Sequence, residues 1–128
     1  MPEVAPAPVL IVEDDATYRR AVERLLELGG YTAVSVGSAN EALNYLATGA
    51  PPCLIVLDLA LPDIQGDALH ATIRSDPALA KTPVVVLTGQ ADPPRLPGVF
   101  ATLPKSGPPD ALLAMVDAAC GRASGEFH

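Results

Sequence analysis

Five strand-like runs recur along the chain, and segments with helical periodicity separate most of them. The runs lie at Val9–Val12, Thr32–Val36, Cys53–Leu57, Val84–Leu87 and Val99–Leu103. Short, mostly unbroken apolar runs are typical of parallel strands that are covered on both faces. Their alternation with helical segments predicts repeated βαβ units, and therefore an α/β fold with a mostly parallel sheet.

Four helices are expected between and after these runs. The first has one apolar face that includes Tyr18, Val22 and Leu26, and Gly29 and Gly30 end it. The second helix starts at Ser38, whose spacing to Glu41 matches a capping box. The third runs from about Gly66 to Arg74 and buries Leu69 and Ile73, and the fourth starts at Pro108. In the connection from Gly89 to Gly98, three prolines remove backbone donors, so we expect a loop or at most one turn there.

Length and composition indicate one globular domain. The 128 residues fall within the common domain size of about 100–150 residues. Hydrophobic residues make up 49% of the chain and the mean hydropathy is +0.30, which excludes a disordered chain. No apolar run approaches the roughly 20 residues of a membrane helix. A net charge of -7 and a pI near 4.5 argue against direct binding to nucleic acid.

The ends of the chain and its cysteines add little chemistry. We expect a domain over residues 9–122, an N-terminal extension over 1–8 with no secretion signal, and a tail over 123–128 that resembles a cloning-site scar. The expected location is the cytoplasm. Cys53 and Cys120 have neither metal-site spacing nor the density of a disulfide scaffold, so we interpret both as small core residues.

Polar side chains follow four of the predicted strands. Glu13 and Asp14 follow the first run, Asp58 the third, Thr88 the fourth and Lys105 the fifth. In a parallel sheet the carboxyl ends of the strands lie on one edge, so these side chains can converge although they are far apart in sequence. The alternatives are that Asp58 caps a nearby turn, that the acidic pair caps the first helix and that Lys105 is a surface residue.

Such a cluster suits phosphoryl transfer. Carboxylates at close quarters repel one another unless a cation is present, and oxygen ligands without His or Cys suit Mg²⁺. Asp58 could then act as a nucleophile toward phosphorus. Thr88 and Lys105 could bind phosphoryl oxygens, and Gly89 would leave a path to Asp58.

These residues, in this order, are similar to a known family. The motifs are Val12-Glu13-Asp14, Leu57-Asp58-Leu59-Ala60-Leu61-Pro62, Leu87-Thr88-Gly89 and Lys105. From Val9 to about Gly121 the chain resembles the receiver domain of two-component response regulators. The resemblance implies a flavodoxin-like, five-stranded parallel sheet in the order 2-1-3-4-5 with helices on both faces.

The resemblance also implies roles for the site residues. Asp58 would accept a phosphoryl group from a phosphohistidine on a sensor histidine kinase or a histidine phosphotransfer protein. Mg²⁺ would bind Asp14, Asp58 and the backbone carbonyl of Ala60 directly, and Glu13 through water. Phosphate-binding groups would come from Ala60, Thr88, Gly89 and Lys105. Asp15 falls outside the metal set, and we expect it to cap the first helix.

Three departures from the family pattern concern signal output. Ser106 follows Lys105, where the family usually has a proline that helps to aim the amine. Thr102, which with Thr88 would form the switch, stands where the family usually has Tyr or Phe. The fourth helix is expected to be shortened or missing.

Three functions therefore compete. The first is a phospho-accepting signalling domain, not a conventional enzyme, that switches a partner or an attached output domain. The second is a pseudo-receiver, which would keep the fold and act as a protein-interaction module without phosphate. The third is a small Mg²⁺-dependent phosphatase, which Ala60 argues against because it leaves no second acid two residues after Asp58. We expect His70 to be a surface residue, and Tyr18 and Tyr45 to serve helix packing.

Overall fold

The domain is built on a five-stranded parallel sheet. The computed structural model describes residues 7–90, 93 and 96–120. The strands are β1 (Val9–Val12), β2 (Ala33–Val36), β3 (Leu54–Asp58), β4 (Val84–Thr88) and β5 (Ala101–Pro104). They pair in parallel in the order β2-β1-β3-β4-β5, which confirms the predicted flavodoxin-like order.

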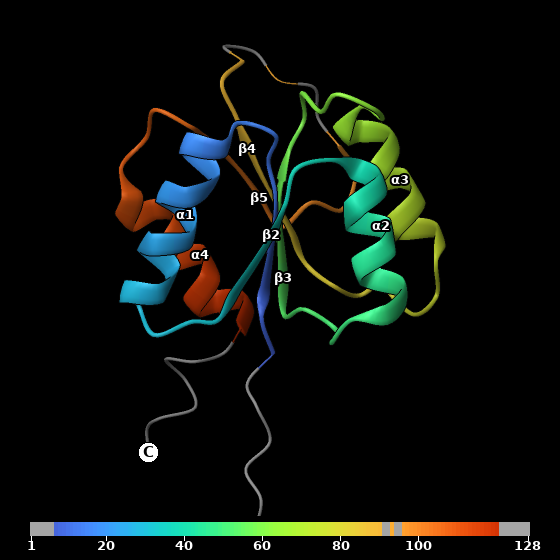
Figure 1. The fold of residues 1–128 in the computed structure, drawn as a ribbon, viewed down its shortest axis with the longest axis horizontal. Helices are drawn as coiled ribbons and strands as arrows, with labels where there is room; N and C mark the ends of the chain where they lie inside the picture. The colour runs from blue at the N-terminus through green and yellow to red at the C-terminus, as the bar shows by residue number, and fades with distance from the viewer. Residues whose placement is uncertain (1–6, 91–92, 94–95, 121–128) are drawn as a thin grey trace, which may run out of the picture.

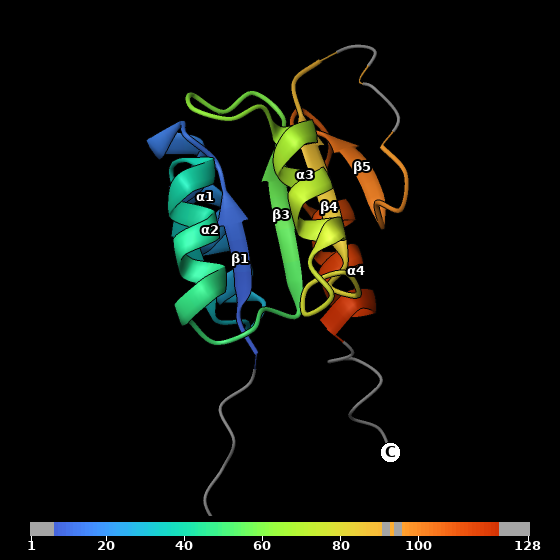
Figure 2. The same ribbon diagram turned by 90° about the vertical axis from the view of Figure 1, so that its right-hand side faces the viewer.

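Four helices in the described part of the chain cover the two faces of the sheet. They are α1 (Ala16–Leu28), α2 (Ala39–Thr48), α3 (Gly66–Ser75) and α4 (Pro109–Cys120). Helices α1 and α4 lie on one face and α2 and α3 on the other, which Figure 1 shows with the sheet nearly edge-on. Figure 2 shows β1, β3, β4 and β5 side by side, with the β3–α3 connection at the carboxyl edge of the sheet. None of the helices described is long and apolar enough to cross a lipid bilayer.

Alternating side chains along each strand divide the core into two layers. On β1, Val9 and Ile11 pack in the cluster under α1 and α4, whereas Leu10 and Val12 pack in the cluster under α2 and α3. Successive side chains of a strand point to opposite faces, so an unbroken apolar run is required where both faces are covered. The two-sided core therefore explains the unbroken apolar runs of the three central strands, β1, β3 and β4, whereas the edge strand β5 alternates between half-buried and exposed positions.

Both predicted N-terminal caps are present. The Asp15 carboxylate accepts hydrogen bonds from the backbone N–H groups of Thr17 and Tyr18, which confirms its role as the cap of α1. The Ser38 hydroxyl accepts a hydrogen bond from the Glu41 N–H, as in a capping box. The Glu41 carboxylate accepts the N–H of Gly37, one residue before the cap residue whose N–H it would accept in a standard capping box. These caps fix where each helix leaves the carboxyl edge of the sheet.

The connection from β4 to β5 contains no helix among its described residues, as the prolines predicted. Strand β5 begins at Ala101, two residues later than expected, although Phe100 still donates a backbone hydrogen bond to Val84. The Arg74 guanidinium donates to the carbonyl of Pro97, and Gly98 has a φ of 80°. A side chain of α3 thus holds the end of this connection.

Two expectations were wrong. His70 is buried, because α3 buries positions 66, 69, 70 and 73, a stripe wider than its apolar residues alone predict. Cys53 and Cys120 form a disulfide with a Cα–Cα distance of 5.2 Å, within the usual range of about 4.4–6.8 Å. The two cysteines precede β3 and end α4, so only the tertiary fold brings them together. Both also pack against the core, as predicted.

Candidate functional site

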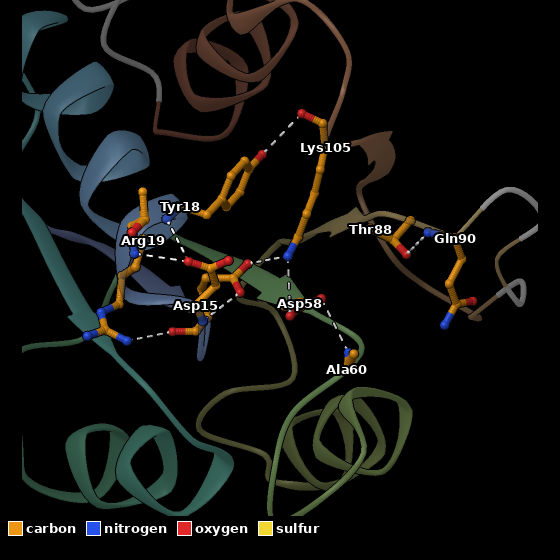
Figure 3. A network of polar contacts seen from close by, with 10 residues as sticks. Asp15, Tyr18, Arg19, Asp58, Ala60, Thr88, Gln90 and Lys105 are labelled. Atoms are coloured by element: carbon orange, nitrogen blue, oxygen red, sulfur yellow. Dashed lines mark hydrogen bonds and ion pairs between the residues drawn. The ribbon is translucent and has the colours of Figure 1, made fainter.

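Side chains from four strands meet at the carboxyl edge of the sheet. Glu13 follows β1, Asp58 ends β3, Thr88 ends β4 and Lys105 follows β5. Figure 3 shows the amine of Lys105 directed toward Asp58, with Thr88 on the far side of Asp58 from α1. The βαβ topology therefore brings together residues that are separated by up to 92 positions in the sequence.

Three carboxylates form a compact acidic cluster. Oxygen atoms of Glu13, Asp14 and Asp58 all lie within 4.8 Å of one another. Glu13 and Asp58 are buried, whereas Asp14 is exposed and open to solvent. A hard divalent cation fits this donor set, because Mg²⁺ prefers carboxylate oxygens and usually retains several of its waters.

Lys105 is the counter-charge to this cluster. Its Nζ lies 2.7 Å from Oε1 of Glu13 and 3.5 Å from Oδ2 of Asp58. Burial acts to lower the pKa of Lys105, but the hydrogen bond to Glu13 and the charges of Asp58 and Glu13 outweigh it and raise that pKa. The amine is therefore a cation that lies between the two buried carboxylates.

Glu13 is held by its neighbours on both sides. Its Oε2 accepts the N–H of Asp15 at 3.0 Å, and the Arg19 guanidinium donates to its backbone carbonyl at 2.8 Å. Burial raises the pKa of Glu13 above its usual value, although the hydrogen bonds from Lys105 and Asp15 oppose that rise. A buried carboxylate whose charge is costly gains most from a nearby cation.

The loop after β3 lies against Asp58 and α2. The N–H of Ala60 donates to Oδ1 of Asp58 at 3.2 Å. Farther along the loop, the Asp63 carboxylate accepts the N–H groups of Ala39 and Asn40 at 2.9 and 2.8 Å. The hydrogen bond from Asn40 is the main cause of the lowered pKa of Asp63. These contacts fix the backbone of Ala60 beside the carboxylate.

The remaining predicted residues differ in their surroundings. Thr88 is buried, and its hydroxyl accepts the N–H of Gln90 at 3.0 Å. Gly89 is exposed, and a Cβ there would meet no atom within 4 Å, so the approach over this residue is open. Thr102 is exposed on β5, which is an edge strand.

Tyr18 makes a contact with Lys105 that its sequence pattern does not predict. As predicted, Tyr18 packs against the core under α1 and α4, but the Nζ of Lys105 also lies 4.8 Å from the centre of its ring. Its hydroxyl donates a long hydrogen bond of 3.5 Å to the Lys105 carbonyl, which Figure 3 shows beside the lysine side chain. Burial raises the pKa of Tyr18, so it is a neutral phenol. The position of Tyr18 in the first turn of α1, just after the acidic residues, was the feature of the sequence that could have indicated this contact.

A family model matches this arrangement. The model for the response regulator receiver domain matches residues 9–117, which is most of the chain. The chain belongs to this family. The receiver domain is a signalling domain, and the acidic cluster, Asp58, Thr88 and Lys105 all fall within the matched residues.

Individual relatives agree with this assignment. Protein Rrf1 of Nitratidesulfovibrio vulgaris is 30% identical over 115 residues, which cover 89% of this chain and 83% of Rrf1. DNA-binding transcriptional regulator NtrC of Klebsiella pneumoniae is 32% identical over 85% of this chain, but the match covers 24% of NtrC. A solved structure of a putative response regulator from Chloroflexus aurantiacus has a TM-score of 0.82 at 28% identity, and the match covers 92% of this chain and 100% of that chain.

The receiver domain corresponds to part of several relatives. The match covers 32% of a probable transcriptional regulator, ycf27, from Guillardia theta, and 18% of the C4-dicarboxylate transport transcriptional regulatory protein DctD from Rhizobium meliloti. The chain therefore spans a third or less of the length of these two curated relatives.

Proposed function

We propose that this receiver domain accepts a phosphoryl group on Asp58 from a phosphohistidine of a sensor histidine kinase or a histidine phosphotransfer protein. The observation that carries the proposal is the position of Lys105, whose amine reaches both Glu13 and Asp58. An acceptor carboxylate beside a fixed cation is the arrangement that phosphoryl transfer requires, because the reaction depends on positioning and on charge stabilisation.

The transfer is a displacement at phosphorus. A carboxylate oxygen of Asp58 attacks the phosphorus atom, the P–N bond of the phosphohistidine breaks, and its electron pair stays on the imidazole nitrogen. The product is an acyl phosphate on Asp58. Lys105 and the hydroxyl of Thr88 would bind the phosphoryl oxygens, and the N–H of Ala60 already donates to Asp58 Oδ1. The open approach over Gly89 leaves room for the donor.

Asp14, Asp58 and the backbone carbonyl of Ala60 would hold Mg²⁺ directly, and Glu13 would contact it through water. The close approach of the three carboxylate groups supports this assignment. Mg²⁺ would neutralise the carboxylates and the incoming phosphoryl oxygens, which otherwise repel one another. Glu13 also binds Lys105, which is consistent with an outer position in the metal site.

A groove beside the site could receive the phosphodonor protein. It has a volume of about 430 Å³ and begins at Tyr18 and Lys105. Apolar residues of α1, including Leu25 and Leu28, line it opposite the β5–α4 connection. Leu28, at the end of α1, is 77% exposed and would add apolar contact area to such a partner.

A pseudo-receiver remains the second candidate. Thr102 is exposed and has no ring to move between two positions, and the described part of the β4–β5 connection has no helix. These features would alter the surface through which phosphorylation is usually read. They leave the acidic cluster and Lys105 intact, so we place phosphorylation first.

The test is phosphorylation by a small donor. With acetyl phosphate and Mg²⁺, intact-mass spectrometry should find one added phosphoryl group on the wild-type domain and none on Asp58→Asn. Asp67→Asn, which changes an exposed aspartate of α3, is the matched control and should behave as the wild type. Binding of Mg²⁺ without any adduct would favour the pseudo-receiver.

The domain limits and the cellular setting also remain proposals. We assign the receiver to residues 9–122, with an extension at 1–8 and an added tail at 123–128; most of the extension and all of the tail lie outside the described residues. Because relatives such as NtrC are longer, we propose that an output domain is attached or is a partner. We also propose that the domain works in the cytoplasm and binds neither membrane nor nucleic acid directly.

A further inference from the structure

The Lys105 side chain is oriented so that its amine points toward Asp58. A lysine side chain is flexible, so an amine that acts at one point must be held by its surroundings. Ser106 follows Lys105, so the proline that helps to aim the amine in the family is missing here. The groups that hold the amine are Glu13, Asp58 and the ring of Tyr18.

Tyr18 touches the same lysine at both ends. Its ring centre lies 4.8 Å from Nζ, which is within the roughly 6 Å of a cation–π contact. Its hydroxyl donates to the backbone carbonyl of Lys105 at 3.5 Å. The ring itself is fixed by the first turn of α1, where Asp15 accepts the Tyr18 N–H, and by packing against the core.

We propose that Tyr18 is a positioning residue that aims the Lys105 amine at Asp58 during phosphoryl transfer, an inference that rests on the proposed function. The two carboxylates that bind the amine also belong to the acidic cluster, so a metal ion held there would neutralise part of their charge and weaken their attraction for Lys105. The ring carries no net charge and offers no carboxylate oxygen to the metal. Its contact with the amine would therefore persist when the ion pairs weaken.

Lysine NMR tests the contact without any phosphorylation. The chain contains two lysines, Lys81 and Lys105, and Lys81 is exposed. In a lysine-labelled sample the methylene protons next to the Lys105 amine should be shifted upfield by the ring, and those of Lys81 should not. The shift should remain at saturating Mg²⁺ and in Tyr18→Phe, and it should disappear in Tyr18→Leu.

Phosphorylation kinetics then test the role. A partly exposed cation–π contact of about 1 kcal/mol corresponds to about a fivefold change in rate. At saturating Mg²⁺ and acetyl phosphate, Tyr18→Leu should be phosphorylated about fivefold more slowly than wild type, and Tyr18→Phe about as fast. Mg²⁺ affinity should be unchanged in both. Tyr31→Leu, which removes a ring packed against the same core, should keep the Lys105 shift and the wild-type rate.

A Lys105 shift that survives in Tyr18→Leu would overturn the inference, as would a Tyr18→Leu domain that is phosphorylated at the wild-type rate. An equal loss of rate in Tyr31→Leu would also overturn it, because general loosening of the core would then explain the effect. A wild-type domain that accepts no phosphoryl group would instead overturn the proposed function, and the NMR shift would still show whether Tyr18 holds the amine.

Discussion

At the scale of single residues, His70 is a buried polar side chain of α3 that lies outside the candidate site. Asp58, Thr88 and Lys105 could be placed at strand ends because the apolar runs before them mark the strands. His70 could not be placed, because sequence analysis treated a polar residue as exposed, whereas it completes the buried i, i+3, i+4, i+7 stripe of α3. Its Nε2 is buried without a hydrogen-bond partner in the described structure.

His70 should make stability depend on pH. Burial, with a smaller contribution from the charge of Arg74, lowers the pKa of His70 below 6.5. The unfolded chain therefore binds a proton first as pH falls, and stability is lost from about pH 6.5 downward. His70→Leu should remove that part of the loss and raise the free energy of unfolding at pH 7 by about 1 kcal/mol.

Urea unfolding of both proteins between pH 7.5 and pH 5 measures this effect. The difference between the two curves isolates His70, since Glu13 and the other carboxyl groups titrate in both. Parallel curves would mean that the imidazole is protonated as easily in the folded domain as in the unfolded chain.

At the scale of elements, caps and breakers in the sequence predicted where most helices begin and end. Asp15, Ser38 and the prolines of the β4–β5 connection acted locally, so their effects could be inferred without the fold. The contact between α3 and the end of β3 depends on tertiary structure, so it could not be inferred from the sequence. A Cβ on Gly66 would lie 2.6 Å from the carbonyl oxygen of Asp58 and 2.6 Å from the Cα of Leu59.

Gly66→Ala should therefore destabilise the domain, although alanine is the better helix former. Helix propensity alone favours alanine by up to about 1 kcal/mol, whereas overpacking against backbone atoms costs about 1–3 kcal/mol. We expect a net loss of about 1–2 kcal/mol by chemical denaturation, and slower phosphorylation because Asp58 lies at the contact.

Gly89→Ala is the matched control, because its Cβ would enter open space. Its free energy of unfolding should stay within about 0.5 kcal/mol of wild type. A Gly66→Ala domain as stable as this control would show that α3 can move away from β3 at little cost.

At the scale of the whole molecule, the two edges of the sheet have separate roles. The carboxyl edge carries the candidate site, and the opposite edge carries the disulfide between Cys53 and Cys120. The alternation of strands and helices predicted a mostly parallel sheet, and the family resemblance implied its strand order. The disulfide was not predictable, because nothing in the spacing of two cysteines says that the start of β3 meets the end of α4.

Reduction of the disulfide should lower stability and leave the site intact. The bond joins residues 67 positions apart, so its loss frees the unfolded chain and costs about 4 kcal/mol on a chain-entropy basis. Thermal unfolding with and without dithiothreitol measures the change, and phosphorylation of Asp58 should persist. Cys53→Ser should unfold at one temperature under both conditions. A reducing cytoplasm would favour the dithiol form, so the less stable form would be the relevant one there.

The central claim is that Glu13, Asp14, Asp58 and Lys105 form one site in which Asp58 is the phosphoryl acceptor. The most direct measurement is to treat the phosphorylated domain with borohydride, which reduces an acyl phosphate to an alcohol, and to sequence its peptides. The account predicts homoserine at position 58 only, and only when Mg²⁺ and phosphodonor were both supplied. Reduction at Asp14 or at any other carboxyl group, or no reduced residue at all, would contradict it.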